Sequence, residues 1–271
     1  MTRLDKKWLR HAFDNAAVEY DGIISLQKKV GRQLLDFLIP GDETSLMILD
    51  VGCGTGFCIS ELAKSDWDAQ FIGLDVAMGM LRQARCRVGD RADFVCADAE
   101  TLPLPDNSVD MIISNLALQW CSDLDGAFSG FQRILKPDGV LLFSIFGDRT
   151  LNELRDAWSQ VDEFSHVNHF HTTDYLKRLM VDAGFVESAL NSQTHGVRYS
   201  SVLELMRELK GIGAHNVTLG RCRGLTGKGR FNNMVAAYEA RMLKNEIYAT
   251  YDVSFGSARK MKTVAEIHKV A

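Results

Sequence analysis

The stretch ILDVGCGTGFCISELAK, residues 48–64, decides the fold. An apolar run is followed by three glycines in G-x-G-x-G spacing, and these are followed by apolar residues at helical spacing. Glycine permits a tight turn and lets a ligand approach the backbone closely. The stretch therefore predicts a strand over residues 46–51, a ligand-facing loop and a helix over residues 56–64.

Apolar runs and helical patterns alternate after this unit. Strands that are interleaved with helices form a parallel sheet with helices on both faces. The sequence therefore predicts an α/β fold with a Rossmann-like, mostly parallel sheet. Strands are expected at residues 70–74, 93–97, 109–114 and 139–146, and helices at residues 78–86, 123–135, 151–161 and 172–182.

The segments around this core are mostly helical. Residues 1–40 carry two helical patterns, which we call the flap, and residues 200–245 predict helices around a glycine-rich middle, which we call the insertion. Residues 184–199 predict a strand of roughly 8–10 residues. We expect one domain over residues 1–271, with a sheet core at residues 46–195 and 246–260 and the insertion before the last strand.

The composition excludes several classes of protein. A net charge of -4 over 271 residues excludes a generally basic chain that coats nucleic acid. No apolar run approaches the roughly 18–20 residues of a membrane span, and charges interrupt the N-terminus where a secretory signal needs an apolar centre. Six widely spaced cysteines without a C-x-x-C pair indicate free thiols. We expect a cytoplasmic protein with no membrane or nucleic-acid partner.

Three acidic residues follow predicted strands. Asp50 stands at the mouth of the glycine loop, where it would repel the pyrophosphate of a dinucleotide. Asp75 has the position of an acid that binds ribose hydroxyls, and Asp98 follows the third strand, where it can reach an adenine amino group. S-adenosylmethionine carries an ammonium, a sulfonium and only one carboxylate. The three acids therefore favour S-adenosylmethionine as the ligand.

Each of these signals alone has a second interpretation. Glycine turns join strands to helices in many sheets, and aspartates after strands are common helix caps. The ribose acid also suits NAD, so an NAD-dependent oxidoreductase is an alternative, which Asp50 and the G-x-G-x-G spacing disfavour. A binding protein that keeps the fold without catalysis is another, which the intact glycine loop disfavours. The joint placement of the acids favours a cofactor site.

Four motifs resemble the successive motifs of class I S-adenosylmethionine-dependent methyltransferases: ILDVGCGTG, GLDVAMGML, ADAETLPLPDNSVDMIISNLALQW and RILKPDGVLLFS. The resemblance covers roughly residues 10–190 and implies a seven-stranded sheet with an antiparallel strand, for which residues 185–194 and 248–258 are suitable. It implies S-adenosylmethionine as cofactor. The residues expected to bind it are Asp50, Gly52, Cys53, Gly54, Gly56, Asp75, Val76, Met80, Asp98, Ala99, Asn115 and Leu116.

Nearly the whole chain resembles the malonyl-acyl-carrier-protein O-methyltransferases of biotin synthesis. The most particular part is LKGIGA…GR…LTG in the insertion. That family methylates the free carboxyl of malonyl-acyl carrier protein, so that fatty-acid enzymes can build a pimeloyl chain on the ester. The resemblance implies an acidic acyl carrier protein, or malonyl-coenzyme A, as partner. A small-molecule or quinone-type acceptor is the alternative, against which the insertion argues.

Methyl transfer to a carboxylate needs little proton chemistry. A carboxylate with a pKa near about 4 is already ionised at neutral pH and needs no general base. The site must align the acceptor oxygen with the methyl–sulfur axis and exclude water. We expect Tyr20 as a lid residue and Asn115 as a positioning residue. Trp120 and Phe170 are expected beside the transferred methyl and the acceptor channel, although lone aromatic residues often serve packing.

A basic segment offers a partner for an acidic acceptor. Residues 198–230 hold seven Arg or Lys against two Glu. Such a patch steers an acidic carrier protein, although a solvated helical face has the same composition. The candidates for holding the malonyl carboxylate are Arg149, Arg198 and Arg221.

Three histidines, His166, His169 and His171, raise the question of a metal. Their H-x-x-H-x-H spacing lacks the i, i+4 pairing of helical zinc sites, and no carboxylate or cysteine set accompanies them. We therefore expect no metal.

Overall fold

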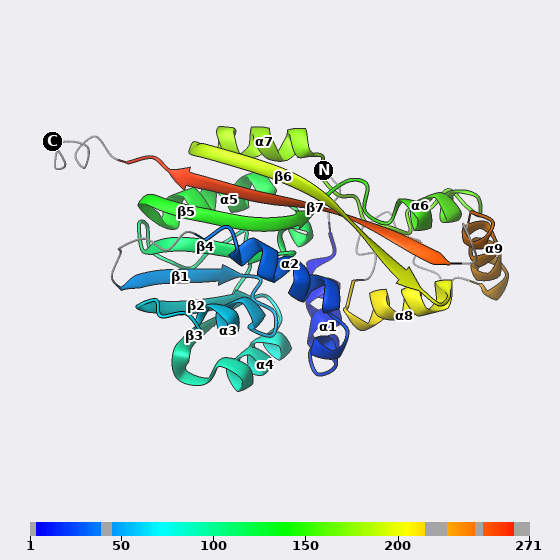
Figure 1. Cartoon of the computed structure of the whole chain (residues 1–271), viewed down its shortest axis with the longest axis horizontal. Helices are drawn as coiled ribbons and strands as arrows, with labels where there is room; N and C mark the ends of the chain where they lie inside the picture. The colour runs from blue at the N-terminus through cyan, green and yellow to red at the C-terminus, as the bar shows by residue number, and fades with distance from the viewer. Residues whose placement is uncertain (1–3, 39–44, 215–226, 242–245, 263–271) are drawn as a thin grey trace.

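The protein is described by a computed structural model over residues 4–38, 45–214, 227–241 and 246–262. The strands are β1 Leu46–Val51, β2 Ala69–Asp75, β3 Ala92–Cys96, β4 Val109–Asn115, β5 Leu135–Phe146, β6 Phe185–Tyr199 and β7 Ile247–Lys260. Within these described ranges they form a seven-stranded sheet of order β3-β2-β1-β4-β5-β7-β6 (Figure 1). β7 is antiparallel to β5 and β6, and the other neighbours are parallel. The predicted fold class is confirmed.

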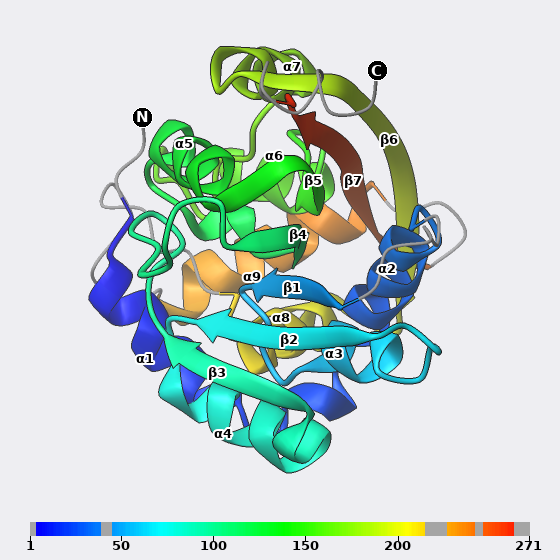
Figure 2. The ribbon, with the colours of Figure 1, turned by 90° about the vertical axis from the view of Figure 1, so that its left-hand side faces the viewer.

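Helices cover both faces of this sheet (Figure 2). They are α1 Lys6–Ala16, α2 Ser25–Leu35, α3 Phe57–Leu62, α4 Met78–Val88, α5 Leu124–Ile134, α6 Asn152–Ser159, α7 Thr173–Asp182, α8 Val202–Gly211 and α9 Lys228–Glu239, with 3-10 turns η1 Tyr20–Gly22, η2 Gly89–Arg91 and η3 Leu118–Trp120. Helices α2 and α3 pack on the face that carries Ile48 and Ile113, and α5 and α7 on the face that carries Leu49 and Ile112. Both faces of β1 and β4 are buried, which explains the apolar runs at residues 46–49 and 111–113.

The flap forms the two helices that its periodicity predicts. Asp5 begins α1, because its side chain accepts a hydrogen bond from the backbone N–H of Trp8. Helix α2 buries Leu26, Val30 and Leu34 against the sheet. The short turn η1 joins the two helices. No helix of the described ranges has the length and apolar character needed to cross a bilayer.

Strand β6 is longer than the sequence predicts, whereas β7 agrees with the last strand expected over residues 246–260. β6 has 15 residues, and most of its central side chains are exposed. A strand with two solvated faces shows no apolar alternation, which is why its length escapes sequence reasoning. The two strands reach beyond the sheet core to the end of the molecule where α6, α8 and α9 gather (Figure 1).

The loops that follow β1 and β4 touch at Gly52. This residue has φ +69°, and a Cβ added to it would lie 2.2 Å from the Cβ of Ala117. Such a distance is far inside van der Waals contact, and a positive φ strains any other residue. Gly52 therefore lets the two loops meet.

We expect Gly52→Ala to lower the free energy of unfolding by about 3–5 kcal/mol, from the clash and the backbone strain together. Gly184→Ala is the matched control, because Gly184 has φ +83° but its added Cβ meets only Gln132 at 3.7 Å. Urea unfolding followed by circular dichroism measures both variants. Ala117→Gly should restore part of the stability lost in Gly52→Ala. Equal losses in the two single variants would contradict the close contact.

Candidate active site

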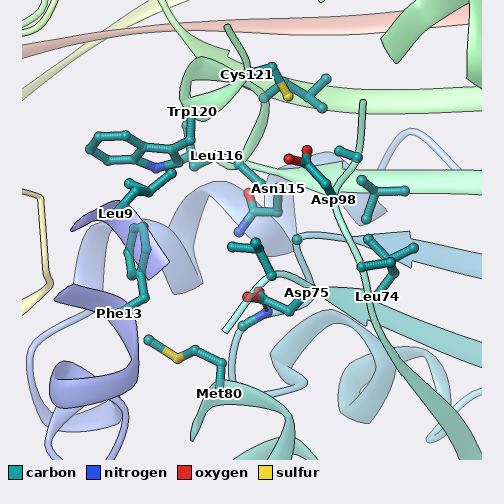
Figure 3. A pocket seen from close by; sticks show the side chains of 18 of the residues that line it. Leu9, Phe13, Leu74, Asp75, Met80, Asp98, Asn115, Leu116, Trp120 and Cys121 are labelled. Atoms are coloured by element: carbon teal, nitrogen blue, oxygen red, sulfur yellow. Dashed lines mark hydrogen bonds between the residues drawn. The ribbon is translucent and has the colours of Figure 1, made fainter. Parts of the chain in front are cut away.

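A cavity opens at the carboxyl ends of β1, β2 and β4, beneath the flap (Figure 3). It encloses about 780 Å³, including space that is open to solvent, and this size is typical of small-molecule sites. Open α/β sheets bind their ligands at this edge. The predicted cofactor residues that line it are Gly52, Gly54, Asp75, Val76, Met80, Asp98, Ala99, Asn115 and Leu116.

A second cavity adjoins the first behind the glycine loop. Asp50 and Cys53 line it, together with Gly52 and Gly54, which line both cavities. An added Cβ on Gly54 would meet nothing closer than the Tyr20 ring at 4.0 Å, so this glycine leaves room for a ligand.

Gly56 differs from the other predicted cofactor residues, because it lines neither cavity. It has φ +78° and lies against Ala84 of α4. Gly56 thus serves helix packing, the role that a third glycine often has in such loops.

Asp50 carries a buried carboxyl group that is costly to ionise. Its side chain is buried, and Oδ2 has no hydrogen-bond partner among the described residues. Burial, and to a smaller extent the nearby Asp75, raises the pKa of Asp50 to about 7. A buried polar atom without a partner is costly. A ligand ammonium placed at this oxygen would remove that cost, so Asp50 fits a cationic ligand group.

Asp75 is held by the backbone around it. Oδ2 accepts a hydrogen bond from the Gly54 N–H at 2.9 Å, and Oδ1 accepts one from the Ala77 N–H at 2.8 Å. Burial raises the pKa of Asp75 to about 6, although these two N–H groups act in the opposite direction. The carboxylate is fixed between the glycine loop and the start of α4. It keeps acceptor capacity for ligand hydroxyls.

Asp98 is engaged by the flap. Lys6 of α1 contacts Asp98 Oδ2 at 2.5 Å and Glu100 Oε1 at 2.6 Å. All three side chains are partly exposed, so these pairs are screened by solvent. Lys6 lines the cavity beside Asp98. An adenine amino group at Asp98 would share this carboxylate with Lys6.

Asn115 joins β4 to the flap and to β5. Its amide donates to the carbonyl oxygen of Gln27 in α2 at 3.0 Å, and its Oδ1 accepts from Ser144 at 2.8 Å. Leu116, which follows with φ +49°, also lines the cavity. The side chain of Asn115 therefore positions α2, and the residue lines both cavities.

Aromatic residues cover the cavity from the flap side. The Phe13 ring meets Trp120 edge-on, with 5.5 Å between ring centroids (Figure 3). The Tyr20 ring lines both cavities. Burial raises the pKa of the Tyr20 hydroxyl, which excludes it as a base at neutral pH. These rings can shield a reaction from water.

Of the residues predicted for the acceptor, Tyr20 and Trp120 line this cavity, whereas the other described ones do not. Phe170 packs on Phe146 at the end of β5, with 5.8 Å between ring centroids. Arg149 makes a two-nitrogen contact with the buried carboxylate of Asp252, at 3.0 and 3.2 Å. Arg198 is exposed and lies 3.5 Å from Glu246. Arg221 lies outside the described residues.

His166 and His171 contact different side chains. His166 contacts Asp162 at 2.8 Å and stacks on Trp158, whereas His171 stacks on Tyr175. Over the described residues, no group of three or more His, Cys, Asp or Glu is placed to hold a metal. The five described cysteines are free thiols.

Comparison with known proteins adds the identity of the chain. Residues 49–143 match the model of a methyltransferase domain. A malonyl-acyl-carrier-protein O-methyltransferase of Gallionella capsiferriformans is 41% identical over 265 residues, which cover 95% of this chain and 91% of the relative. The chain belongs to the malonyl-acyl-carrier-protein O-methyltransferase family.

Two further matches extend this finding. The biotin biosynthesis bifunctional protein BioHC of Cellvibrio japonicus is 40% identical over 94% of this chain, which spans 50% of that longer protein. A Haemonchus contortus phosphoethanolamine N-methyltransferase 2, solved in complex with S-adenosyl-L-methionine, superposes with a TM-score of 0.58 at 18% identity, over 92% of this chain and 57% of that one. This last likeness supports the fold. The family resemblance inferred from the motifs is confirmed.

Sequence reasoning missed two contacts that shape this methyltransferase site. Lys6 reaches Asp98 from a position 92 residues earlier, and Gln27 reaches Asn115 through its backbone carbonyl. A charge on the polar face of a helix carries no sign of its distant partner. A backbone acceptor carries no residue-type signal at all.

The raised pKa of Asp50 gives the site a pH dependence. Unfolded aspartate has a pKa of about 3.9, whereas folded Asp50 has one of about 7. Between these values the folded protein keeps a proton that the unfolded chain has released. This group therefore makes the free energy of unfolding fall as pH rises from about 4 to about 7, after which its effect is constant.

We expect Asp50→Asn to remove this slope in urea unfolding, leaving the smaller slope from Asp75 at lower pH. A cofactor ammonium at Asp50 would bind its ionised form, so cofactor affinity of the wild type should then fall up to about tenfold for each pH unit below about 7. Titration calorimetry with S-adenosylmethionine measures this dependence. The same slope of affinity in Asp50→Asn would assign the titration to another group.

Proposed function

We propose that this protein transfers a methyl group from S-adenosylmethionine to the free carboxylate of a malonyl group on acyl carrier protein. The product is the malonyl methyl ester that starts pimeloyl synthesis for biotin. The observation that best supports this proposal is the 41% identity to a malonyl-acyl-carrier-protein O-methyltransferase over 95% of the chain. The acidic cavity under the flap supports it, because its carboxylates can accept hydrogen bonds from a cationic nucleoside.

We assign a different group of the cofactor to each acidic residue at the strand ends. Asp50 would hold the ammonium, Asp75 the ribose hydroxyls and Asp98 the adenine amino group. Gly54 leaves the space beside the loop. When bound, S-adenosylmethionine supplies an electrophilic methyl group on its sulfonium. Met80, which is buried and lines the cavity, adds an apolar contact for the nucleoside.

The chain needs no general base for this reaction. A malonyl carboxylate is ionised at neutral pH and attacks with its own lone pair. The protein must orient it and keep water out. Tyr20, Phe13 and Trp120 would exclude water from the cavity, and Asn115 would fix the distance between β4 and the flap.

An acidic carrier protein requires cations near the acceptor entrance. The insertion supplies them: its described Arg and Lys residues are Arg207, Lys210, Lys228, Arg230 and Arg241, and Arg198 precedes it in β6. Complementary charge steers such partners and raises the association rate. We propose this insertion as the docking region for acyl carrier protein, with malonyl-coenzyme A as a poorer acceptor. Arg149, Arg198 and Arg221 are proposed as partners of the malonyl carboxylate.

The acceptor is tested by methyl transfer from radiolabelled S-adenosylmethionine. We expect base-labile label on malonyl-acyl carrier protein, less on malonyl-coenzyme A and none on acetyl-acyl carrier protein, which lacks the free carboxylate. Equal labelling of both malonyl acceptors would remove the docking role of the insertion. Cofactor binding without label on any of the three would leave the fold and point to a small-molecule or quinone-type acceptor.

The absence of a general base predicts a flat pH profile. With both substrates saturating, the turnover number should change by less than about twofold between about pH 7.5 and about pH 9, because the acceptor stays ionised throughout. Initial rates across this range measure it. A tenfold rise per pH unit would reveal a titrating base and contradict the mechanism.

A further inference from the structure

Thr55 of the glycine loop is the meeting point of three segments. Its Oγ1 donates a hydrogen bond to Asp21 Oδ1 at 2.8 Å. Arg87 of α4 donates from Nη1 to the Thr55 carbonyl oxygen at 2.7 Å and to Thr55 Oγ1 at 2.9 Å. Nη2 of Arg87 forms an ion pair with Asp21. One guanidinium thus binds the flap and the glycine loop at once.

Thr55, Asp21 and Arg87 form a triad whose geometry requires an arginine at residue 87. The planar guanidinium presents two nitrogens in fixed directions, one for Thr55 and one for Asp21. Thr55 is buried, and the side chain of Arg87 is only 24% exposed, so the contacts are partly protected from water. A lysine at residue 87 would keep the charge but could not present two planar donors.

The triad holds the turn that carries Tyr20. Asp21 is the next residue in η1, and the Tyr20 ring lines both cavities beside Gly54. Lys28 of α2 also donates to the carbonyl oxygen of Asp21 at 2.7 Å. The position of η1 over the glycine loop is therefore fixed from α4 and from α2.

The flap is tied to the other end of α4 as well. Asp14 of α1 accepts a hydrogen bond from the Gly79 N–H, in the first turn of α4, at 2.6 Å. Helix α4 therefore carries one flap contact at each end, and the cavity lies between the flap and the strand ends. A ligand that enters or leaves beneath Tyr20 requires η1 to separate from the glycine loop.

We infer that Arg87 is a positioning residue that latches the Tyr20 turn over the glycine loop and limits the exchange of cofactor and demethylated product. The inference rests on the proposed function only for the identity of the ligand. Arg87 itself lines neither cavity and acts through Asp21 and through Thr55, which lines the second cavity. Its contribution is to the lifetime of the closed flap.

The test measures release of S-adenosylhomocysteine, which needs no acceptor. Arg87→Met should raise the dissociation rate about tenfold, the effect expected from losing a charge-assisted contact. Arg87→Lys should fall between this variant and the wild type. Arg82→Met is the matched control, because Arg82 is an exposed arginine of the same helix that does not line the cavity. Stopped-flow tryptophan fluorescence follows release, and hydrogen exchange of residues 17–24 reports opening of the turn.

A second variant separates the latch from a merely structural tie. Asp21→Asn breaks the ion pair from the flap side and leaves α4 unchanged, so it tests the inference even if Arg87→Met fails to fold. The double variant Asp21→Asn with Arg87→Met should release product no faster than Arg87→Met alone, because both remove one interaction. Faster exchange at residues 17–24 should accompany faster release.

Two results would overturn the latch. One is an unchanged release rate in folded Arg87→Met and Asp21→Asn, and the other is an equal increase in Arg82→Met. A protein that binds no S-adenosylhomocysteine would overturn the proposed function and this inference with it. Binding with an unaltered release rate would overturn the latch alone.

Discussion

The contact between the loops after β1 and β4 sets the geometry of the site. Because β1 lies between β2 and β4, the carboxyl ends of these strands are neighbours. The backbone of Gly52 packs against Ala117. Asp50 of β1 and Asn115 of β4 line the same cavity beside this contact. Asn115 then holds the carbonyl of Gln27, so the flap takes its position from the same contact. A side chain at Gly52 would push the two loops apart at Ala117.

The site keeps groups that work against stability. Asp50 has a buried oxygen without a described partner, and Asp75 lies close enough to raise the pKa of Asp50 further. Such groups persist where the surrounding structure holds them in place. Here the apolar face of α2, through Val30 and Leu34, and the buried strands β1 and β4 supply that support. A cationic ligand at this oxygen would supply the missing partner.

Local patterns explain why much of the fold was predictable. The alternation of strands and helices, the glycine turn and the acids at strand ends are read within short windows of sequence. Contacts between distant residues are not: Arg87 and Asp21 are separated by 66 residues, and Asn115 and Gln27 by 88. Arg149 shows the same limit, because nothing in its sequence context indicates its contact with Asp252, 103 residues away. Sequence pattern thus locates a charge but not its partner.

The flap contacts both the cavity and the insertion. An added Cβ on Gly211, at the end of α8, would lie 2.7 Å from Cδ1 of Ile23, and one on Gly213 would lie 3.2 Å from Cδ1 of Phe13. Phe13 also contacts Trp120 at the edge of the cavity. A ligand in the cavity and a partner at the insertion would therefore both affect the position of the flap helices. Because linkage is reciprocal, whatever free energy a carrier protein contributes to closing the flap also strengthens cofactor binding by the same amount.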